Sequence, residues 1–161
     1  MIVEFTSEQL ATKIEPRDNW ALISIVESER TIPESPYYNV PRWDRWRHSI
    51  VLGFHDIDVD KWPEYEAAWA EQCGYPAKCF NRDHARQIME FIRSLPSDTE
   101  KIVVHCAGGV SRSAAVARFL SEEIYRCDCY RSFFPNKVDF KEYTSDNKWV
   151  EQVLREEYGE V

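Results

Sequence analysis

The chain has 161 residues, 43% of them apolar, which suits one domain (residues 1–161) with a single hydrophobic core. Its net charge of −8 disfavours nucleic acid and anionic membranes as the main partner, because both attract basic surfaces. No apolar run approaches the roughly 18 residues needed to span a membrane, and the N-terminal residues do not resemble a secretory signal. We therefore expect a cytoplasmic protein without a membrane partner, in which the five cysteines are reduced thiols.

The first half of the chain contains short apolar segments separated by polar, proline-containing stretches. Apolar runs rich in β-branched residues favour strands, and a hydroxyl residue before a helical pattern favours a helix start. The predicted elements are, in chain order, a short edge strand at 2–5, a short helix capped by Thr6 or Ser7 that reaches about residue 14, a buried strand at 20–26, a long loop at 27–46 and a strand at 49–54.

The second half contains stronger helical patterns. Asn81 precedes apolar residues at helical spacing, and an alanine-rich helical pattern begins at Ser113. The predicted elements are a short helix at 64–72, a helix from Asn81 to before Pro96, a central strand at 102–105, a helix from 113 to about 125 and a C-terminal helix capped by Ser145 or Asp146. Because strands alternate with helices, we predict an α/β fold with a mainly parallel sheet of about four to five strands flanked by helices.

The most informative segment is residues 105–113, His-Cys-Ala-Gly-Gly-Val-Ser-Arg-Ser, which joins the central strand to the helix that follows. Backbone N–H groups of a loop at a helix N-terminus bind an oxyanion, and the same field lowers the pKa of a thiol such as Cys106 at the start of the loop. Arg112 at the end of the loop has the planar fork that binds two phosphate oxygens. The order of these residues predicts a site for covalent phosphate transfer.

This segment resembles the signature of the cysteine-dependent protein tyrosine phosphatases, His-Cys-(five residues)-Arg-Ser/Thr. Its ending, Gly-Val-Ser-Arg-Ser at residues 109–113, is similar to the Gly-x-Ser-Arg-Ser ending that is common in the small dual-specificity branch. The resemblance implies the three-layer α/β fold of that family and extends weakly from about residue 20 to 125.

Each chemical group in the segment has an expected role. Cys106 is the candidate nucleophile, and Arg112 is expected to bind the phosphoryl group and stabilise the transition state. The resemblance implies that Ser113 hydrogen-bonds the sulfur, and His105 is expected to organise the loop rather than to act as a base. The remaining candidate phosphate-binding residues, through their backbone N–H groups, are Ala107, Gly108, Gly109, Val110 and Ser111.

A general acid is also needed to protonate the leaving oxygen. Residues 54–57, Phe-His-Asp-Ile, resemble the Phe-x-Asp-Ile pattern of small bacterial and phage-like tyrosine phosphatases, so Asp56 is the leading candidate. Asp58 is the next candidate, and Glu64 is a third because Trp-Pro-Glu at 62–64 resembles the Trp-Pro-Asp of the classical enzymes. A proline-initiated helix with an acidic first turn is the alternative interpretation of Glu64.

Substrate recognition and metal binding are less well specified. Aromatic residues beside arginines in the 27–46 region would suit a phosphotyrosine ring and a phosphopeptide, although the same aromatics would equally pack this loop on the core. The cysteine spacings are not those of common zinc sites, so we expect no metal and no cofactor. The residues considered for substrate recognition are Tyr37, Tyr38, Trp43 and Trp46 with Arg42, Arg45 and Arg47. The residues considered for zinc are Cys73, Cys79, Cys127 and Cys129 with His84.

The favoured hypothesis is a metal-independent phosphatase that acts on phosphotyrosine, and by the same chemistry on phosphoserine or phosphothreonine, in a protein or peptide. One alternative is a weak or inactive module that binds phosphate or a phosphopeptide. Another is a lipid or RNA 5′-phosphatase that uses the same loop, although the loop lacks the lysines that family members acting on phosphoinositides often carry. The oligomeric state is left open.

Overall fold

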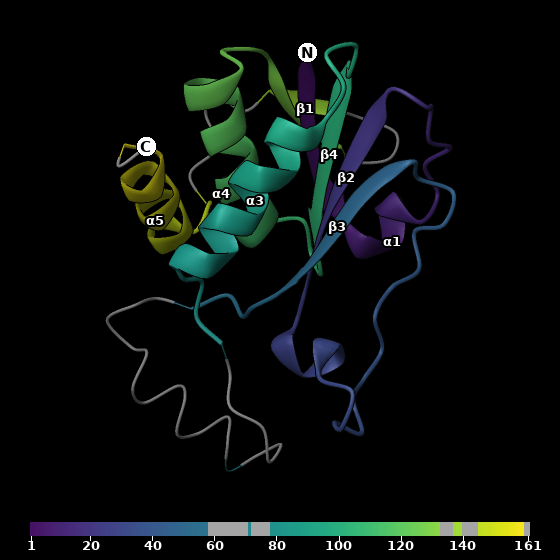
Figure 1. Cartoon of the computed structure of the whole chain (residues 1–161), viewed down its shortest axis with the longest axis vertical. Coiled ribbons are helices and arrows are strands. Elements are labelled where there is room, and N and C mark those ends of the chain that lie inside the picture. Colours follow the sequence, from purple (N-terminus) through teal and green to yellow (C-terminus); the bar gives the residue numbers. More distant parts are fainter. Residues whose placement is uncertain (58–70, 72–77, 133–136, 140–144, 160–161) are drawn as a thin grey trace.

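A parallel β-sheet forms the centre of the molecule (Figure 1). The computed structural model describes residues 1–57, 71, 78–132, 137–139 and 145–159. Within them the strand order is β3-β2-β4-β1-β5-β6, in which the first five strands are parallel and β6 is antiparallel to β5. The predicted α/β class is confirmed. The strands are β1 (Ile2–Ser7), β2 (Trp20–Val26), β3 (His48–Gly53), β4 (Lys101–Cys106), β5 (Cys129–Ser132) and β6 (Lys137–Asp139).

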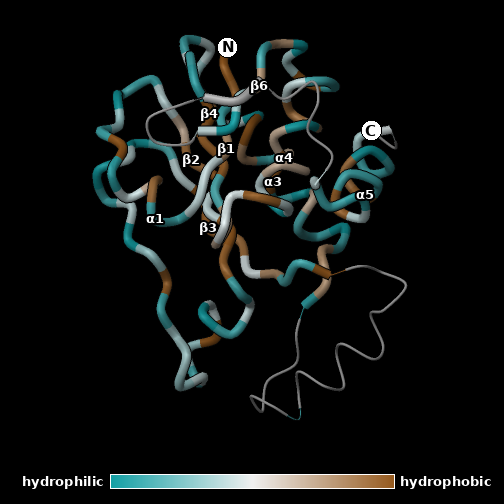
Figure 2. The backbone as a smooth tube through the Cα atoms, turned by 180° about the vertical axis from the view of Figure 1, so that it is seen from behind, coloured by the Kyte–Doolittle hydropathy of each residue, from teal (hydrophilic) through white to brown (hydrophobic). Residues whose placement is uncertain are grey.

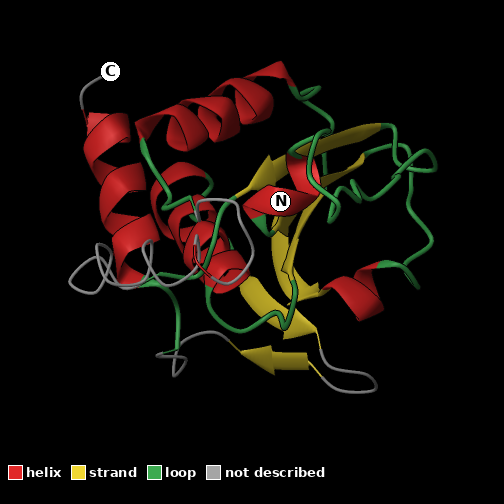
Figure 3. Ribbon diagram, turned by 90° about the horizontal axis from the view of Figure 1, so that it is seen from below, coloured by secondary structure: helices red, strands yellow, loops and turns green. Residues whose placement is uncertain are grey.

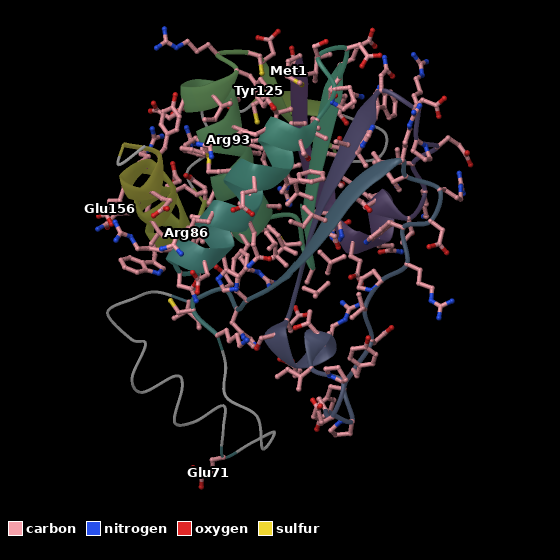
Figure 4. The ribbon with its side chains drawn as sticks, in the orientation of Figure 1. Met1, Glu71, Arg86, Arg93, Tyr125 and Glu156 are labelled. Atoms are coloured by element: carbon pink, nitrogen blue, oxygen red, sulfur yellow. The ribbon has the colours of Figure 1, made fainter. Side chains whose placement is uncertain are left out.

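Helices cover the sheet on two sides, as the view from below shows (Figure 3). The longer helices lie on one side of the sheet, and the short α1 (Glu8–Ala11) lies on the other. Arg86, Arg93 and Glu156 lie on the exposed outer side of the layer of longer helices (Figure 4). The helices are α1 (Glu8–Ala11), α3 (Arg82–Ser94), α4 (Arg112–Phe119) and α5 (Lys148–Gly159), with a 3₁₀ turn η1 (Ser28–Thr31) after β2 and a π-helical turn η3 (Leu120–Ile124) after α4. None of the helices in these described stretches is long and apolar enough to cross a membrane.

Alternation along the strands divides the core between the two faces of the sheet. On β2, Ile23 and Ile25 pack into the large cluster beneath α3, α4 and α5, whereas Leu22 packs into a smaller cluster on the other face. Figure 2 shows hydrophobic stretches in the middle of the molecule and hydrophilic residues along the surrounding loops. The two clusters hold the sheet rigid, so that the loops at its carboxyl edge have a fixed base.

Several predicted elements are confirmed by the structure. The strands at 20–26 and 102–105 match β2 and β4, and Ser7 caps α1 by accepting a hydrogen bond from Leu10 N at 3.2 Å. Asn81 caps α3 and forms a capping box with His84. Local sequence signals are sufficient to predict these strands and helix caps, because each strand or cap depends on residues within one strand or one helical turn.

Other predictions at this level are wrong. The first strand is not an edge strand, since β1 pairs with β4 on one side and with β5 on the other. The polar segments that form β5 and β6 carry no strong strand pattern and were not predicted. The cap of α5 is Asn147, whose Oδ1 accepts from Val150 N at 3.1 Å, and neither Ser145 nor Asp146. The predicted helix at 64–72 lies outside the described residues apart from residue 71.

Candidate active site

The segment from Cys106 to Arg112, called here the Cys–Arg loop, joins the end of β4 to the start of α4. It therefore lies at the carboxyl edge of the parallel strands, where ligands commonly bind in such sheets. In Figure 1 the chain leaves the same edge at the lower end of β2 and runs into η1. Residues of η1 and of the segment after β3 are thus brought close to the loop.

Contacts with β1 and β5 fix the shape of the Cys–Arg loop. Gly109 has φ +64°, and a Cβ placed on it would lie 2.4 Å from the carbonyl carbon of Thr6. Glu8 N donates to Ala107 O at 3.3 Å, and Arg131 Nε donates to Gly109 O at 2.8 Å. The loop is consequently packed against the end of β1 so closely that only glycine fits at position 109.

Cys106 lies at the base of this loop and is only 3% exposed. Its Sγ is 3.2 Å from Ser113 Oγ, at the first turn of α4. Burial by itself raises the pKa of the Cys106 thiol, but the hydrogen bond with Ser113, the charge of Arg112 and the N–H of Val110 outweigh it and lower the pKa below its ordinary value. The structure thus places a thiol with enhanced thiolate character at the position that the sequence predicted for the nucleophile.

Arg112 extends across the carboxyl edge of the sheet and is buried. Its Nη1 donates to Phe54 O at 2.8 Å, and its Nη2 donates to Glu27 Oε1 at 3.2 Å. Burial raises the pKa of Glu27, yet a backbone hydrogen bond and the Arg112 charge hold it below its ordinary value, so the pair is ionic. Glu27 was not predicted, because nothing in the sequence links the end of β2 with Arg112.

The segment after β3 brings Asp56 to the far end of the loop. Asp56 Oδ1 accepts a hydrogen bond from Ser111 Oγ at 2.7 Å and another from Asn147 Nδ2 at 2.7 Å, while the side chain remains exposed. The structure therefore places Asp56, the leading candidate acid, beside the loop. Asp58 and Glu64 lie outside the described residues.

His105 lies behind the loop and is completely buried. Its Nε2 is 2.6 Å from Ser24 Oγ, its Nδ1 is 3.4 Å from Cys106 O, and its ring lies 5.1 Å from that of Trp43. Burial lowers the pKa of His105 to about 4, which keeps the imidazole neutral near pH 7. A neutral, fully enclosed ring is suited to organising the loop and not to exchanging protons with a ligand.

A second buried histidine, His55, anchors the segment that carries Asp56. Its Nε2 lies 2.9 Å from Glu29 Oε2 in η1, and its Nδ1 accepts from Lys78 N at 3.2 Å and lies 3.2 Å from Ser28 Oγ. Burial lowers the pKa of His55, although the Glu29 carboxylate acts in the opposite direction. The residue next to the candidate acid is therefore held from two sides, a feature that the sequence does not reveal.

The aromatic residues predicted for substrate recognition separate into two groups. Trp43 and Trp46 pack with Leu22 on the second face of the sheet, so for them the alternative of core packing is correct. Tyr37 and Tyr38 are about half exposed, at 51% and 49%. Arg42 and Arg45, together with both tryptophans, line an open pocket of about 230 Å³ on the α1 side of the sheet.

The cysteines and acidic residues form no metal centre in the described part of the chain. Cys79, Cys106, Cys127 and Cys129 are free thiols there, and no group of three or more His, Cys, Asp or Glu side chains is arranged to hold a metal ion. Cys73 lies outside the described residues. Burial raises the pKa of Cys129 to about 12 and also raises the pKa of Cys127, so Cys106 is chemically distinct from both.

Comparisons of this chain with protein-family models, with curated proteins and with solved structures found no match. A functional assignment therefore depends on the residues of the site itself. Three features carry chemical meaning: the thiol of Cys106 with its lowered pKa, the buried guanidinium of Arg112 and the carboxylate of Asp56 on the rim.

Proposed function

We propose that this protein is a metal-independent phosphatase that hydrolyses phosphotyrosine, and by the same chemistry phosphoserine or phosphothreonine, in protein substrates. The observation that supports it most is the arrangement of three groups around one loop. A buried thiol of lowered pKa lies at the start of the loop, and an arginine and a carboxylate lie at its other end. A thiolate nucleophile also requires a reducing compartment such as the cytoplasm.

Binding of the phosphoryl group is assigned to the Cys–Arg loop. An arginine has five N–H donors, and within the described residues Arg112 uses two of them, on Phe54 and Glu27. The remaining donors and the loop amides at the N-terminus of α4 suit the oxygens of a phosphate dianion. Phe54 and Glu27 hold the guanidinium in place before the substrate binds, which reduces the entropic cost of binding.

In the first chemical step, Cys106 Sγ attacks phosphorus, and an S–P bond forms as the P–O bond to the substrate breaks. Asp56 in its protonated form gives its proton to the departing oxygen. In the second step, water attacks phosphorus while the Asp56 carboxylate accepts a proton from it, and the S–P bond breaks. Ser113, 3.2 Å from the sulfur, stabilises the thiolate that is released. Phosphate and the dephosphorylated protein are the products.

The test is hydrolysis of para-nitrophenyl phosphate in the presence of a metal chelator, with wild type, Cys106→Ser and Arg112→Lys. We expect chelator-resistant turnover in wild type, none in Cys106→Ser, and a loss of at least about 100-fold in Arg112→Lys, because lysine lacks the planar fork. Cys127→Ser is the matched control, since this thiol has a raised pKa and lies beside the start of β1, away from the loop.

Near-full activity of Cys106→Ser would refute the thiol mechanism. If wild type shows no turnover but binds orthovanadate, the binding module becomes the better description of the site. If turnover of an aryl phosphate is weak while a phosphoinositide or an RNA 5′-phosphate is hydrolysed rapidly, the loop chemistry stands and the substrate class is wrong.

A further inference from the structure

We propose that Asn147 is a positioning residue that holds the Asp56 carboxyl over the Cys–Arg loop in the orientation needed for proton transfer. This inference rests on the proposed function, in which Asp56 is the general acid. Asn147 precedes α5, and it is 91 positions from Asp56 in the sequence. Neither its residue type nor its neighbours in the chain point to such a role.

Asn147 contacts both the segment that carries Asp56 and the Cys–Arg loop. Its Nδ2 donates to Asp56 Oδ1 at 2.7 Å and to Ile57 O at 3.3 Å, so one amide group holds the side chain and the backbone of the same segment. Its backbone N donates to Ser111 O at 3.1 Å, in the Cys–Arg loop. Asn147 therefore bridges the loop to the segment that carries the acid.

The side chain of Asn147 is itself held in one orientation. Its Oδ1 accepts from Val150 N at 3.1 Å, and its backbone O accepts from Glu151 N at 3.3 Å, as expected of the residue that caps α5. Because the amide oxygen is committed to the cap, the NH₂ group must face Asp56. The amide group is thus oriented by the helix and cannot rotate without uncapping it.

The preceding residue anchors this cap to the helix that follows the loop. Asp146 is buried, and its Oδ2 accepts from Arg118 Nε of α4 at 2.9 Å and lies 3.0 Å from Lys148 Nζ. Burial raises the pKa of Asp146, but its hydrogen bonds and the Arg118 charge lower it to about 2, so the ion pair persists across the neutral pH range. Figure 1 shows α4 and α5 side by side at this junction.

The two donors determine which oxygen of Asp56 serves the reaction. Ser111 Oγ and Asn147 Nδ2 both donate to Oδ1, and Oδ2 has no partner within the described residues. An oxygen that accepts two hydrogen bonds is a poor site for a proton, so the acid proton resides on Oδ2. By occupying Oδ1, Asn147 and Ser111 leave Oδ2 as the oxygen that can give its proton to the leaving group.

The experiment compares two substrates whose dependence on a general acid differs. Phenyl phosphate has a basic leaving group that must be protonated, whereas 2,4-dinitrophenyl phosphate has a leaving group that departs as an anion. The variants are Asn147→Asp and Asn147→Ser, which both keep an oxygen for the α5 cap but remove the amide donor. Asp56→Asn and the double variant Asp56→Asn/Asn147→Asp complete the cycle.

We expect kcat for phenyl phosphate to fall about 10- to 100-fold in Asn147→Asp, within the 10²- to 10⁴-fold that general acids contribute. For 2,4-dinitrophenyl phosphate we expect a change of less than about 3-fold, and Asn147→Asp should cause no further loss when Asp56 is already Asn. Asn147→Ser provides the same comparison if the aspartate variant folds poorly.

An equal fall with both substrates, or additive losses in the double variant, would overturn the positioning role, because either result indicates general damage to the fold. Wild-type kcat in both Asn147 variants, with Asp56→Asn strongly impaired, would also overturn it and would leave the proposed function intact. Absence of turnover in wild type would refute the proposed function itself and this inference with it.

Discussion

The packing of Gly109 against the end of β1 predicts that this glycine tolerates no side chain. Gly109 has φ +64°, a conformation in which a residue with a Cβ is strained by about 1–3 kcal/mol. An added Cβ would also lie 2.4 Å from Thr6 C, 2.5 Å from Ser7 N and 2.7 Å from Thr6 O. These are backbone atoms at the end of a central strand, and they cannot move aside as a flexible side chain would.

The two effects together give the expected magnitude for Gly109→Ala. Overpacking of a rigid region costs about 1–3 kcal/mol, so together with the backbone strain the free energy of unfolding should fall by roughly 2–6 kcal/mol. In a chain of this length, each kcal/mol corresponds to about 2–4 °C in the midpoint of thermal unfolding. Gly108→Ala is the matched control, because the nearest atom to its added Cβ is Val110 Cγ2 at an ordinary 3.6 Å.

Urea and thermal unfolding of the two variants and wild type measure this directly. We expect Gly108→Ala to remain within about 1 kcal/mol of wild type, the ordinary range for a solvent-facing loop substitution. A Gly109→Ala variant as stable as Gly108→Ala, with unchanged hydrolysis of para-nitrophenyl phosphate, would refute the conclusion that the end of β1 shapes the Cys–Arg loop.

Ser113→Ala should raise the pKa of the Cys106 thiol, because it removes a hydrogen bond that favours the thiolate, and the pH midpoint of iodoacetate alkylation at Cys106, followed by mass spectrometry, should move upward. An unchanged midpoint would contradict this. His84 and His105 have folded-state pKa values of about 4, lowered by burial from 6.5, so the unfolded chain binds more protons between these values. Their stabilisation is complete above about pH 6.5 and is lost toward pH 4, by about 3 kcal/mol per histidine. Burial raises the pKa of Glu151 to about 7, which acts in the opposite direction, so urea unfolding at pH 7 and pH 5 should show a steeper loss in Glu151→Gln than in wild type. Equal stability of Glu151→Gln at the two pH values would contradict the assignment of neutral buried histidines.

Local signals in the chain were enough for the elements whose determinants lie within a few residues. The apolar run of β2 and the cap of α3 at Asn81 could both be predicted. The position of β1 could not, because a short strand has the same appearance at the edge and in the interior of a sheet. Its neighbours β4 and β5 are determined by pairing between segments far apart in the sequence.

The same distinction applies to the tryptophans of the 27–46 region. Their residue types suit both a ligand-binding wall and a buried core, and the sequence contains nothing that decides between the two. In the structure Trp43 and Trp46 complete the cluster around Leu22, since that face of the sheet has few helices to cover it. Packing of these rings against Leu22 contributes to stability, and both side chains also line the pocket beside Arg42 and Arg45.

The chemistry of the Cys–Arg loop could be predicted without a structure. A thiol, a run of small residues and an arginine between a strand and a helix have few possible arrangements. The tertiary structure was needed to see that Asp56 lies beside that loop and that Asn147 holds its carboxyl group there. Asp56 follows β3, whereas Asn147 directly precedes α5. The two residues meet because the parallel sheet places the carboxyl ends of its strands at one edge, and because α5 packs against α4. Interactions across such distances depend on the packing of the whole chain, which no local pattern of residues encodes.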